Sequence, residues 1–320
     1  MVGNYPKIGP GTKAPSLRNA IAQFDTGKIT LQQLKEIENK VTEEAIAEQA
    51  QAGIDLVTDG QIRWDDGQTY IAQGIEGFKL GGLIRYFDSN TLYRQPSAKG
   101  KLKWKGPITV NDFKFAAARS KKPVKAVLPG PYTLTKLSSN EFYPDLASMV
   151  KDLAVALNEE AKALQSAGAT LIQFDEPCIL KAKADLPLLK EAFATLTRGI
   201  TAKTALYTYF GDIKGIYPDI LKLPFNVIGL DFVGGPANFN ILKTFPSDKS
   251  LAMGIIDARN TKMETVEQVA AAIDRISKVV PSERLYVNPS CGLEFLPRPT
   301  AYQKLVTMVE ATKKNTGVKR

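Results

Sequence analysis

The chain has 320 residues, of which 44% are hydrophobic and 23% charged, with a formal net charge of +9. This composition is typical of a soluble globular protein, and the length suits one α/β barrel or two ordinary domains. Two cysteines are too few for a disulfide scaffold, and without histidine any proton transfer near neutral pH must use a perturbed carboxyl, thiol, amine or phenol.

The basic residues are spread along the chain, without a basic run flanked by aromatic residues. This pattern argues against nucleic acid as a partner and favours a small polyanionic ligand. The sequence shows no leader peptide and no apolar stretch long enough to span a membrane. We therefore expect a cytoplasmic protein that has no membrane partner.

Short apolar runs alternate with segments of helical periodicity along the whole chain, which is typical of parallel strands joined by helices. Eight such strands with helices between them predict a single (β/α)8 TIM barrel domain over residues 1–320. The strands are expected near residues 2–4, 54–57, 124–128, 170–174, 204–207, 227–230, 251–256 and 285–287.

The helices support the barrel. Leu31, Leu34, Ile37, Val41 and Ala45 repeat at helical spacing, and similar stripes occur at 153–164, 266–276 and 305–309. One segment, at about residues 78–110, has glycines, paired aromatics and alternating residues instead. We expect it to form a hairpin insertion between strands two and three that covers one end of the barrel.

Polar residues close almost every apolar run, and in a barrel of this kind the ligand site forms at the carboxyl ends of the strands. Each of these residues could instead cap the next helix or bind loop amides. Many acids and amides around one opening suit a ligand that carries an amine. The residues are Asn4, Asp59, Gln61, Gly130, Tyr132, Asp175, Glu176, Thr208, Asp212, Asp231, Asp257, Asn260, Asn288, Ser290 and Cys291.

These strand ends resemble the cobalamin-independent methionine synthase family over nearly the whole chain. The motifs that carry the resemblance are GNYPKIGP (3–10), QAGID (51–55) with DGQ (59–61), LPGPYT (128–133), IQFDEP (172–177) and NPSCGL (288–293). The family's full-length enzyme resembles two barrels in tandem, of which the second carries zinc and binds homocysteine. Four further strings are similar to the amino-terminal, zinc-free barrel: RYFDSN (85–90), TYFGD (208–212), GLDFV (229–233) and GIIDARN (254–260).

The resemblance also implies what the metal site would need. The family's catalytic barrel binds zinc through one histidine, two cysteines and a glutamate, and this chain aligns Thr208, Phe210, Asp231 and Cys291 with them. A tetrahedral zinc site needs about four nitrogen, sulfur or carboxylate ligands. We therefore expect no bound zinc and no other bound cofactor, with methyl-folate as a possible substrate.

The resemblance assigns binding residues. It implies that Asp175 holds the amino group of homocysteine, that Asn4 and Gln61 belong to the same pocket, and that Ser290 and Cys291 also contact the substrate. Lys7, Lys13, Arg18 and Arg85 fall in or near segments that would bind the glutamate tail of a folate, because cations suit repeated carboxylates. The catalytic residues are unknown, with Asp175, Glu176 and Asp257 as candidates.

The first hypothesis is methyl transfer from a methyl-folate or methylcobalamin to homocysteine, by a zinc-free half that needs a zinc-bearing partner barrel and is inactive alone. A second is a non-catalytic barrel that binds an amino acid or a folate. A third is a metal-independent transferase for another thiol, in which Asp175, Glu176, Tyr132 or Tyr209 handles protons.

Overall fold

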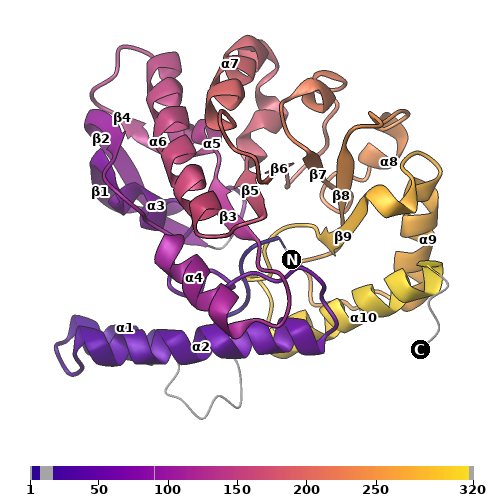
Figure 1. The fold of residues 1–320 in the computed structure, drawn as a ribbon, viewed down its shortest axis with the longest axis horizontal. Helices are drawn as coiled ribbons and strands as arrows, with labels where there is room; N and C mark the ends of the chain where they lie inside the picture. Colours follow the sequence, from indigo (N-terminus) through magenta and orange to yellow (C-terminus); the bar gives the residue numbers. More distant parts are fainter. Residues whose placement is uncertain (1, 8–16, 90, 317–320) are drawn as a thin grey trace.

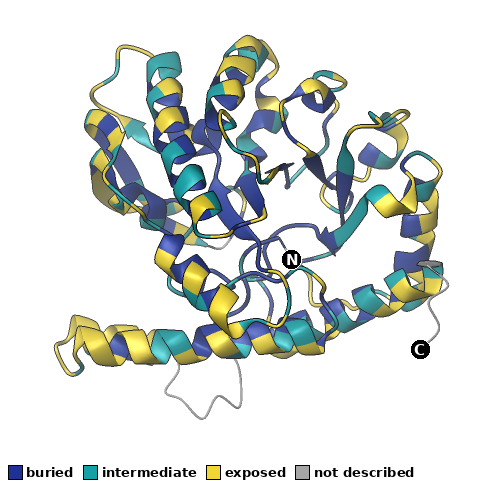
Figure 2. Cartoon of the chain, viewed as in Figure 1, coloured by how far each residue is buried: buried dark blue, intermediate teal, exposed yellow. Residues whose placement is uncertain are grey.

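The computed structural model describes residues 2–7, 17–89 and 91–316. Within these ranges, six parallel strands form a sheet in the order β3-β5-β6-β7-β8-β9 at the centre of the molecule (Figure 1). Their side chains are mostly buried (Figure 2), which confirms the last six expected strands. The strands are β3 (Ala126–Pro129), β5 (Leu171–Asp175), β6 (Lys203–Tyr207), β7 (Val227–Asp231), β8 (Ser250–Ile256) and β9 (Leu285–Pro289).

The first two expected strands, near residues 2–4 and 54–57, do not form regular strands. Val57 makes an isolated parallel bridge to Val124. A side chain replaces the missing strand partner, because Gln49 Nε2 donates to Thr58 O at 3.0 Å and Gln49 Oε1 accepts from Thr58 N at 2.9 Å. A glutamine amide offers both a donor and an acceptor, so it satisfies this backbone without strand pairing.

The ring closes where the last strand meets the first segment of the chain. Leu293 N donates to Asn4 O at 3.0 Å, and Tyr5 N donates to Gly60 O at 3.0 Å. These bonds connect the end of β9 to the amino-terminal segment, and that segment to the loop after Val57. The fold is therefore the expected (β/α)8 barrel, with irregular segments in its first two positions.

The helices surround the sheet, and α2 and α10 run along one side of the molecule (Figure 1). Helix α2 begins with a capping box in which Thr30 and Gln33 satisfy each other's backbone amides. Its buried face includes Leu34, Val41 and Ala45 as expected, but Leu31 is exposed because it opens the first turn. The helices are α1 (Leu17–Asp25), α2 (Leu31–Gln51), α3 (Thr69–Gln73), α4 (Val110–Arg119), α5 (Pro131–Lys136), α6 (Leu146–Ser166), α7 (Leu186–Leu196), α8 (Asn238–Ile241), α9 (Val266–Ser277) and α10 (Arg298–Thr316).

The insertion is an antiparallel hairpin of β1 (Ile75–Arg85) and β2 (Leu92–Trp104). It begins slightly before the expected boundary, at the pair Ile75 and Trp104. Strand β2 also pairs in parallel with β4 (Ser139–Asn140), which ties the hairpin to the barrel. The expected hairpin between the second and third positions of the barrel is confirmed.

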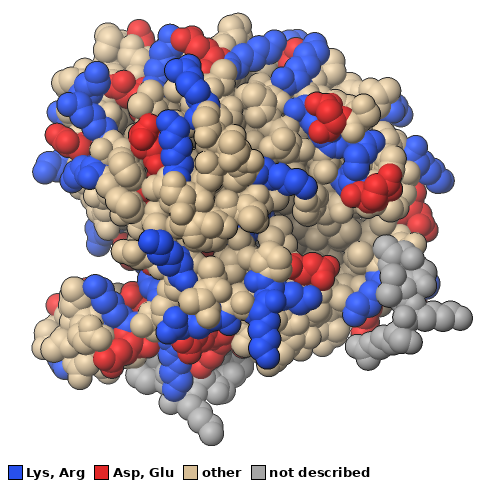
Figure 3. Space-filling model, viewed as in Figure 1, with Lys and Arg blue, Asp and Glu red and all other residues tan. Residues whose placement is uncertain are grey.

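The surface agrees with the scattered distribution of charge in the sequence. On the face shown in Figure 3, lysines and arginines are interspersed with acids and do not gather into one patch. None of the helices in the described ranges is long and apolar enough to cross a membrane.

Candidate active site

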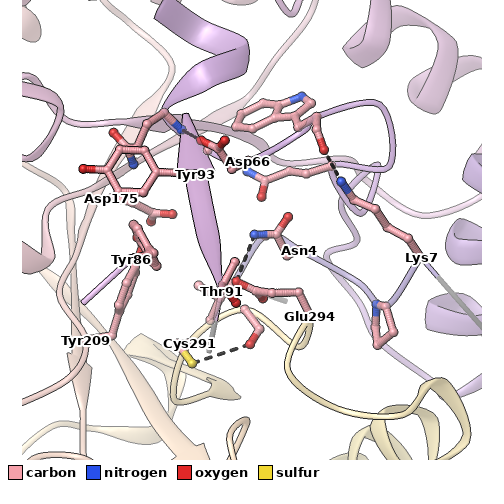
Figure 4. A pocket seen from close by; sticks show the side chains of 18 of the residues that line it. Asn4, Lys7, Asp66, Tyr86, Thr91, Tyr93, Asp175, Tyr209, Cys291 and Glu294 are labelled. Atoms are coloured by element: carbon pink, nitrogen blue, oxygen red, sulfur yellow. Dashed lines mark hydrogen bonds between the residues drawn. The ribbon is translucent and has the colours of Figure 1, made fainter. Parts of the chain in front are cut away.

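A cavity of about 690 Å³ opens at the carboxyl ends of the strands. Its wall combines the amino-terminal segment, the loop at residues 61–68, the end of β5, the segments after β6 and β9, and the hairpin (Figure 4). Such a cavity is large enough for a small organic ligand. Polar or aromatic lining residues include Asn4, Lys7, Gln61, Trp64, Asp65, Asp66, Gln68, Tyr86, Tyr93, Asp175, Tyr209, Phe210, Cys291, Glu294 and Arg298.

The structure brings five of the proposed site residues to this wall: Asn4, Lys7, Gln61, Asp175 and Cys291. The others lie elsewhere or are not described. Arg18 on α1 and Arg85 at the end of β1 are exposed outside the wall, and Lys13 lies outside the described residues. Glu176, Asp257 and Ser290 bind backbone groups, as described below.

Asp175 ends β5 and lies on the cavity wall. Gln173 Nε2 donates to Asp175 Oδ1 at 2.6 Å, and Gln173 Oε1 accepts from the buried Lys125 Nζ. Because residues two apart on a strand point to the same face, Gln173 and Asp175 lie on the same face of β5, and the bond from Lys125 Nζ reaches that face. Burial raises the pKa of the Asp175 carboxyl and lowers the pKa of the Lys125 amine.

Glu176 points away from the cavity and satisfies the start of α5. Its carboxylate accepts from Tyr132 N at 2.9 Å and from Thr133 N at 2.8 Å, in the place where a helix terminus leaves unpaired amides. It fits there because Gly130 has no Cβ, which would collide with the carboxylate. Burial raises the pKa of Glu176 to about 7. This geometry is that of a structural carboxylate.

Asp257 and Ser290 also bind backbone groups. Asp257 Oδ1 accepts from Arg259 N at 2.9 Å, and Ser290 Oγ accepts from Ala258 N at 3.2 Å. Both bonds fix the loop after β8, which is the turn-forming role that short polar side chains often have.

Glu294 is a wall residue that the sequence reasoning missed. Asn4 Nδ2 donates to Glu294 Oε1 at 3.2 Å (Figure 4). Burial raises the pKa of Glu294 to about 7, with a smaller opposing effect from its hydrogen bonds and from Lys7. Its position directly after NPSCGL (288–293), beyond the last strand, was the available signal.

An aromatic group forms the side of the cavity next to the hairpin. The hydroxyls of Tyr86 and Tyr209 lie 3.4 Å apart, and the rings of Tyr86 and Phe210 meet edge to face at a centroid distance of 6.3 Å. Tyr86 follows β1, so the insertion supplies part of the wall. Burial raises the pKa of both tyrosines well above the ordinary value, which keeps the phenols neutral near pH 7.

Lys7 is the cation of the amino-terminal segment that reaches the wall. Its Nζ donates to Trp64 O, and burial lowers its pKa. An amine in this position can pair with a ligand carboxylate, because a nearby negative charge stabilises the charged form of a buried amine.

The four positions aligned with metal ligands have other partners. Asp231 accepts from the backbone amides of Phe210, Val233 and Gly234 at 3.0, 2.9 and 2.8 Å. Thr208 Oγ1 donates to Gly229 O at 3.0 Å. The described part of the chain contains no group of three or more histidine, cysteine, aspartate or glutamate side chains placed to hold a metal ion.

Comparisons with known proteins agree with one another. Residues 1–314 match the model of the family described as cobalamin-independent synthase, catalytic domain. The chain is 35% identical over 315 residues to a methionine synthase of Saccharolobus solfataricus, covering 98% of this chain and 93% of that protein. It is 33% identical over 314 residues to a methionine synthase of Sulfolobus acidocaldarius, covering 98% of this chain and 90% of that protein.

A solved structure supports the fold. A B12-independent methionine synthase from Shewanella sp. W3-18-1, in complex with selenomethionine, superposes with a TM-score of 0.84 at 22% identity, covering 99% of this chain and 97% of that chain. The matching family model is that of the catalytic domain, so the likeness of four strings to the zinc-free barrel stays a prediction.

Proposed function

The chain belongs to the cobalamin-independent methionine synthase family, and from this premise we propose that it takes part in methyl transfer to the sulfur of homocysteine. The observation that carries the proposal is Asp175, a carboxylate held on the wall of a 690 Å³ cavity at the strand ends. Such a group suits the amino end of an amino acid. The methyl donor proposed is a methyl-folate or a methylcobalamin.

We further propose that this barrel acts without zinc, beside a separate zinc-bearing barrel. The four aligned side chains do not fit the ion: Phe210 offers no donor atom, and Asp231 already accepts three amide bonds.

Without a metal, the substrate thiol lacks a means of ionisation. A thiol of pKa ~8.5 is only about 3% ionised at pH 7, so forming the nucleophile costs roughly 2 kcal/mol. The residues of this cavity would bind and orient the amino acid, exclude water and keep its ammonium group paired. The partner barrel would supply the zinc that ionises the substrate thiol.

A mixing assay tests the proposal. The purified chain alone, with homocysteine and either donor, should form no methionine, and adding a zinc-bearing homologous barrel should restore formation. Metal analysis of the same preparation should find less than one zinc per chain. Stoichiometric zinc, or full activity of the metal-free chain alone, would contradict the half-enzyme proposal.

The alternative of a non-catalytic binding protein predicts a different result in the same experiment. The cavity would bind homocysteine, methionine or a folate in calorimetry, yet the chain would stimulate no partner barrel. Binding without stimulation therefore selects the alternative, and stimulation rejects it.

A further inference from the structure

A lysine side chain is buried behind the cavity wall. Lys125 directly precedes β3 and is only 3% exposed. Its Nζ donates to Gln173 Oε1 and lies 4.8 Å from the centroid of the Tyr207 ring, so a hydrogen bond and a cation–π contact hold the amine. Burying an amine is costly unless such partners stabilise its charge. The position of this lysine therefore calls for an account of what it does there.

The ammonium of Lys125 decides which end of the Gln173 amide faces which neighbour. An ammonium group can only donate hydrogen bonds, so the atom of Gln173 beside it must be the carbonyl oxygen. The amide nitrogen then lies on the opposite side with two hydrogens to donate. It donates to Asp175 Oδ1 at 2.6 Å and to Val2 O at 2.8 Å. The amide is thereby saturated, and a reversed amide would place an oxygen against two acceptors.

Both acceptors of the Gln173 amide belong to the cavity wall. Asp175 and Val2 line the cavity, and the segment that contains Val2 also brings Asn4 and Lys7 to the wall. Gln173 is fully buried and, like Lys125, does not line the cavity itself. The buried pair therefore holds two separate segments of the wall from behind.

Lys125 also places a positive charge near Asp175. Besides the amine, the titratable groups that act on Asp175 or feel its charge are acids and phenols: Glu176, Glu294, Tyr86, Tyr207 and Tyr209. The charge of Lys125 favours the Asp175 carboxylate, whereas the charge of Glu294 opposes it. Without the ammonium, the charged groups of this set would all favour the protonated form of Asp175.

We propose that Lys125 is a positioning residue of the candidate active site: its ammonium fixes the donor end of the Gln173 amide toward Asp175 and Val2, and it holds Asp175 as the carboxylate. The inference rests on the proposed function for the ligand that Asp175 meets. Lys125 touches no ligand, so its effect on binding reaches the cavity through Gln173 and through its charge.

Carbon-13 NMR of the aspartate carboxyl groups tests this role without any ligand. The full chain is titrated as wild type, as Lys125→Met and as the control Lys203→Met, which replaces an exposed lysine on β6. Asp175→Asn identifies the Asp175 signal. In Lys125→Met the midpoint for Asp175 should move to higher pH by about 1 unit or more, because an opposite charge has been removed. The control should leave it in place, and an unchanged midpoint in Lys125→Met would overturn the proposal.

Calorimetry with methionine, from about pH 5.5 to 8, measures the consequence for binding. At pH 7, Lys125→Met should lose about tenfold in affinity relative to wild type and should regain part of it toward pH 8, as more Asp175 ionises. A loss of the same size at every pH would assign Lys125 a packing role only and contradict the proposal.

A double variant tests whether Lys125 acts through Gln173. The loss of methionine affinity in Lys125→Met/Gln173→Leu should fall short of the product of the two single losses by more than about twofold, because both changes disrupt one network. A loss equal to the product would show that the two residues act independently. Urea unfolding shows whether each variant retains the fold. If Lys125→Met does not fold, Lys125→Gln, which keeps a hydrogen-bond donor but no charge, decides by the same titration.

The outcomes separate the role of Lys125 from the proposed function. An unchanged Asp175 titration together with methionine formation in the mixing assay would reject the positioning role and leave the function standing. A shifted titration in a chain that binds no methionine and stimulates no partner barrel would support the positioning role and reject the function.

Discussion

Gln173 Nε2 donates a 2.6 Å hydrogen bond to Asp175 Oδ1. The oxygen of the same Gln173 amide accepts a hydrogen bond from Lys125 Nζ. Gln173 therefore connects Asp175 on the cavity wall to the buried amine of Lys125. The orientation of Asp175 therefore depends on a residue that does not itself line the cavity.

Replacing Gln173 by leucine should remove both bonds at once. We expect the unfolding free energy to fall by about 1–3 kcal/mol, because buried polar groups lose their partners. The pKa of Asp175 should rise further, since this hydrogen bond favours the carboxylate. Urea unfolding measures the loss of stability, and the pH dependence of homocysteine affinity in calorimetry measures the change in the pKa of Asp175. The exposed Gln303→Leu serves as the matched control, and equal stability of the two variants would contradict the prediction.

Replacing Glu176 by alanine should weaken the start of α5. The amides of Tyr132 and Thr133 would lose their acceptor, and two unpaired buried donors cost about 2–6 kcal/mol in unfolding free energy. Denaturant unfolding checks this, with the exposed Glu283→Ala as control. A variant of normal stability that had lost methyl transfer would instead place Glu176 in the chemistry.

Stability should decrease as pH rises from about 5 to 7. The folded-state pKa values of Glu176 and Glu294 are raised to about 7, so the folded state binds more protons than the unfolded chain in this window. Their contribution is complete below the unfolded pKa and is lost as pH rises through 7, by up to about 1.4 kcal/mol per pH unit for each group. Urea unfolding across this range measures the slope, and Glu294→Gln should flatten it.

Both thiols should resist modification in the folded protein. Burial raises the pKa of Cys178 to about 12 and that of Cys291 well above its ordinary value, and the reactive species is the thiolate. An aromatic disulfide reagent at pH 7.5 should label neither cysteine rapidly and should label both in urea. Rapid labelling of Cys291 without denaturant would show that its environment favours the anion.

Removing the Tyr86 ring should open the cavity beside the hairpin. Tyr86→Ala removes the aromatic contact with Phe210 and the Tyr86 hydroxyl that lies beside the Tyr209 hydroxyl. We expect homocysteine affinity to fall about tenfold or more, as large aromatic side chains contribute much of the buried area in a site. Tyr86→Phe keeps the ring and should lose less than about threefold. Equal affinity in all three proteins would exclude the hairpin from binding.

The sequence predicts most of the barrel because buried parallel strands leave continuous apolar runs. The last six strands follow this rule, and the antiparallel hairpin was predicted from its glycines and alternating residues instead. The first two positions do not, since Gln49 replaces a strand partner for Thr58. When a side-chain amide takes the hydrogen bonds of a strand partner, the sequence contains no run of alternating or apolar residues that would predict it.

The candidate site is predicted in part. Asp175 reaches the cavity as the last residue of β5, and Asn4 and Gln61 reach it from the irregular segments that take the first two positions of the barrel. Glu176 is adjacent to Asp175, yet neighbouring residues at a strand end point in opposite directions, and it binds a helix terminus instead. Glu294 was missed because the chain reaches the wall again after leaving the last strand.

The bond from Leu293 N to Asn4 O has a consequence for biosynthesis. Asn4 precedes Leu293 by nearly all of the barrel strands, so it is synthesised well before its partner. A nascent chain therefore lacks a complete binding pocket until the segment that contains Leu293 has been made. Shortened products that end before this point should remain unable to retain the amino acid.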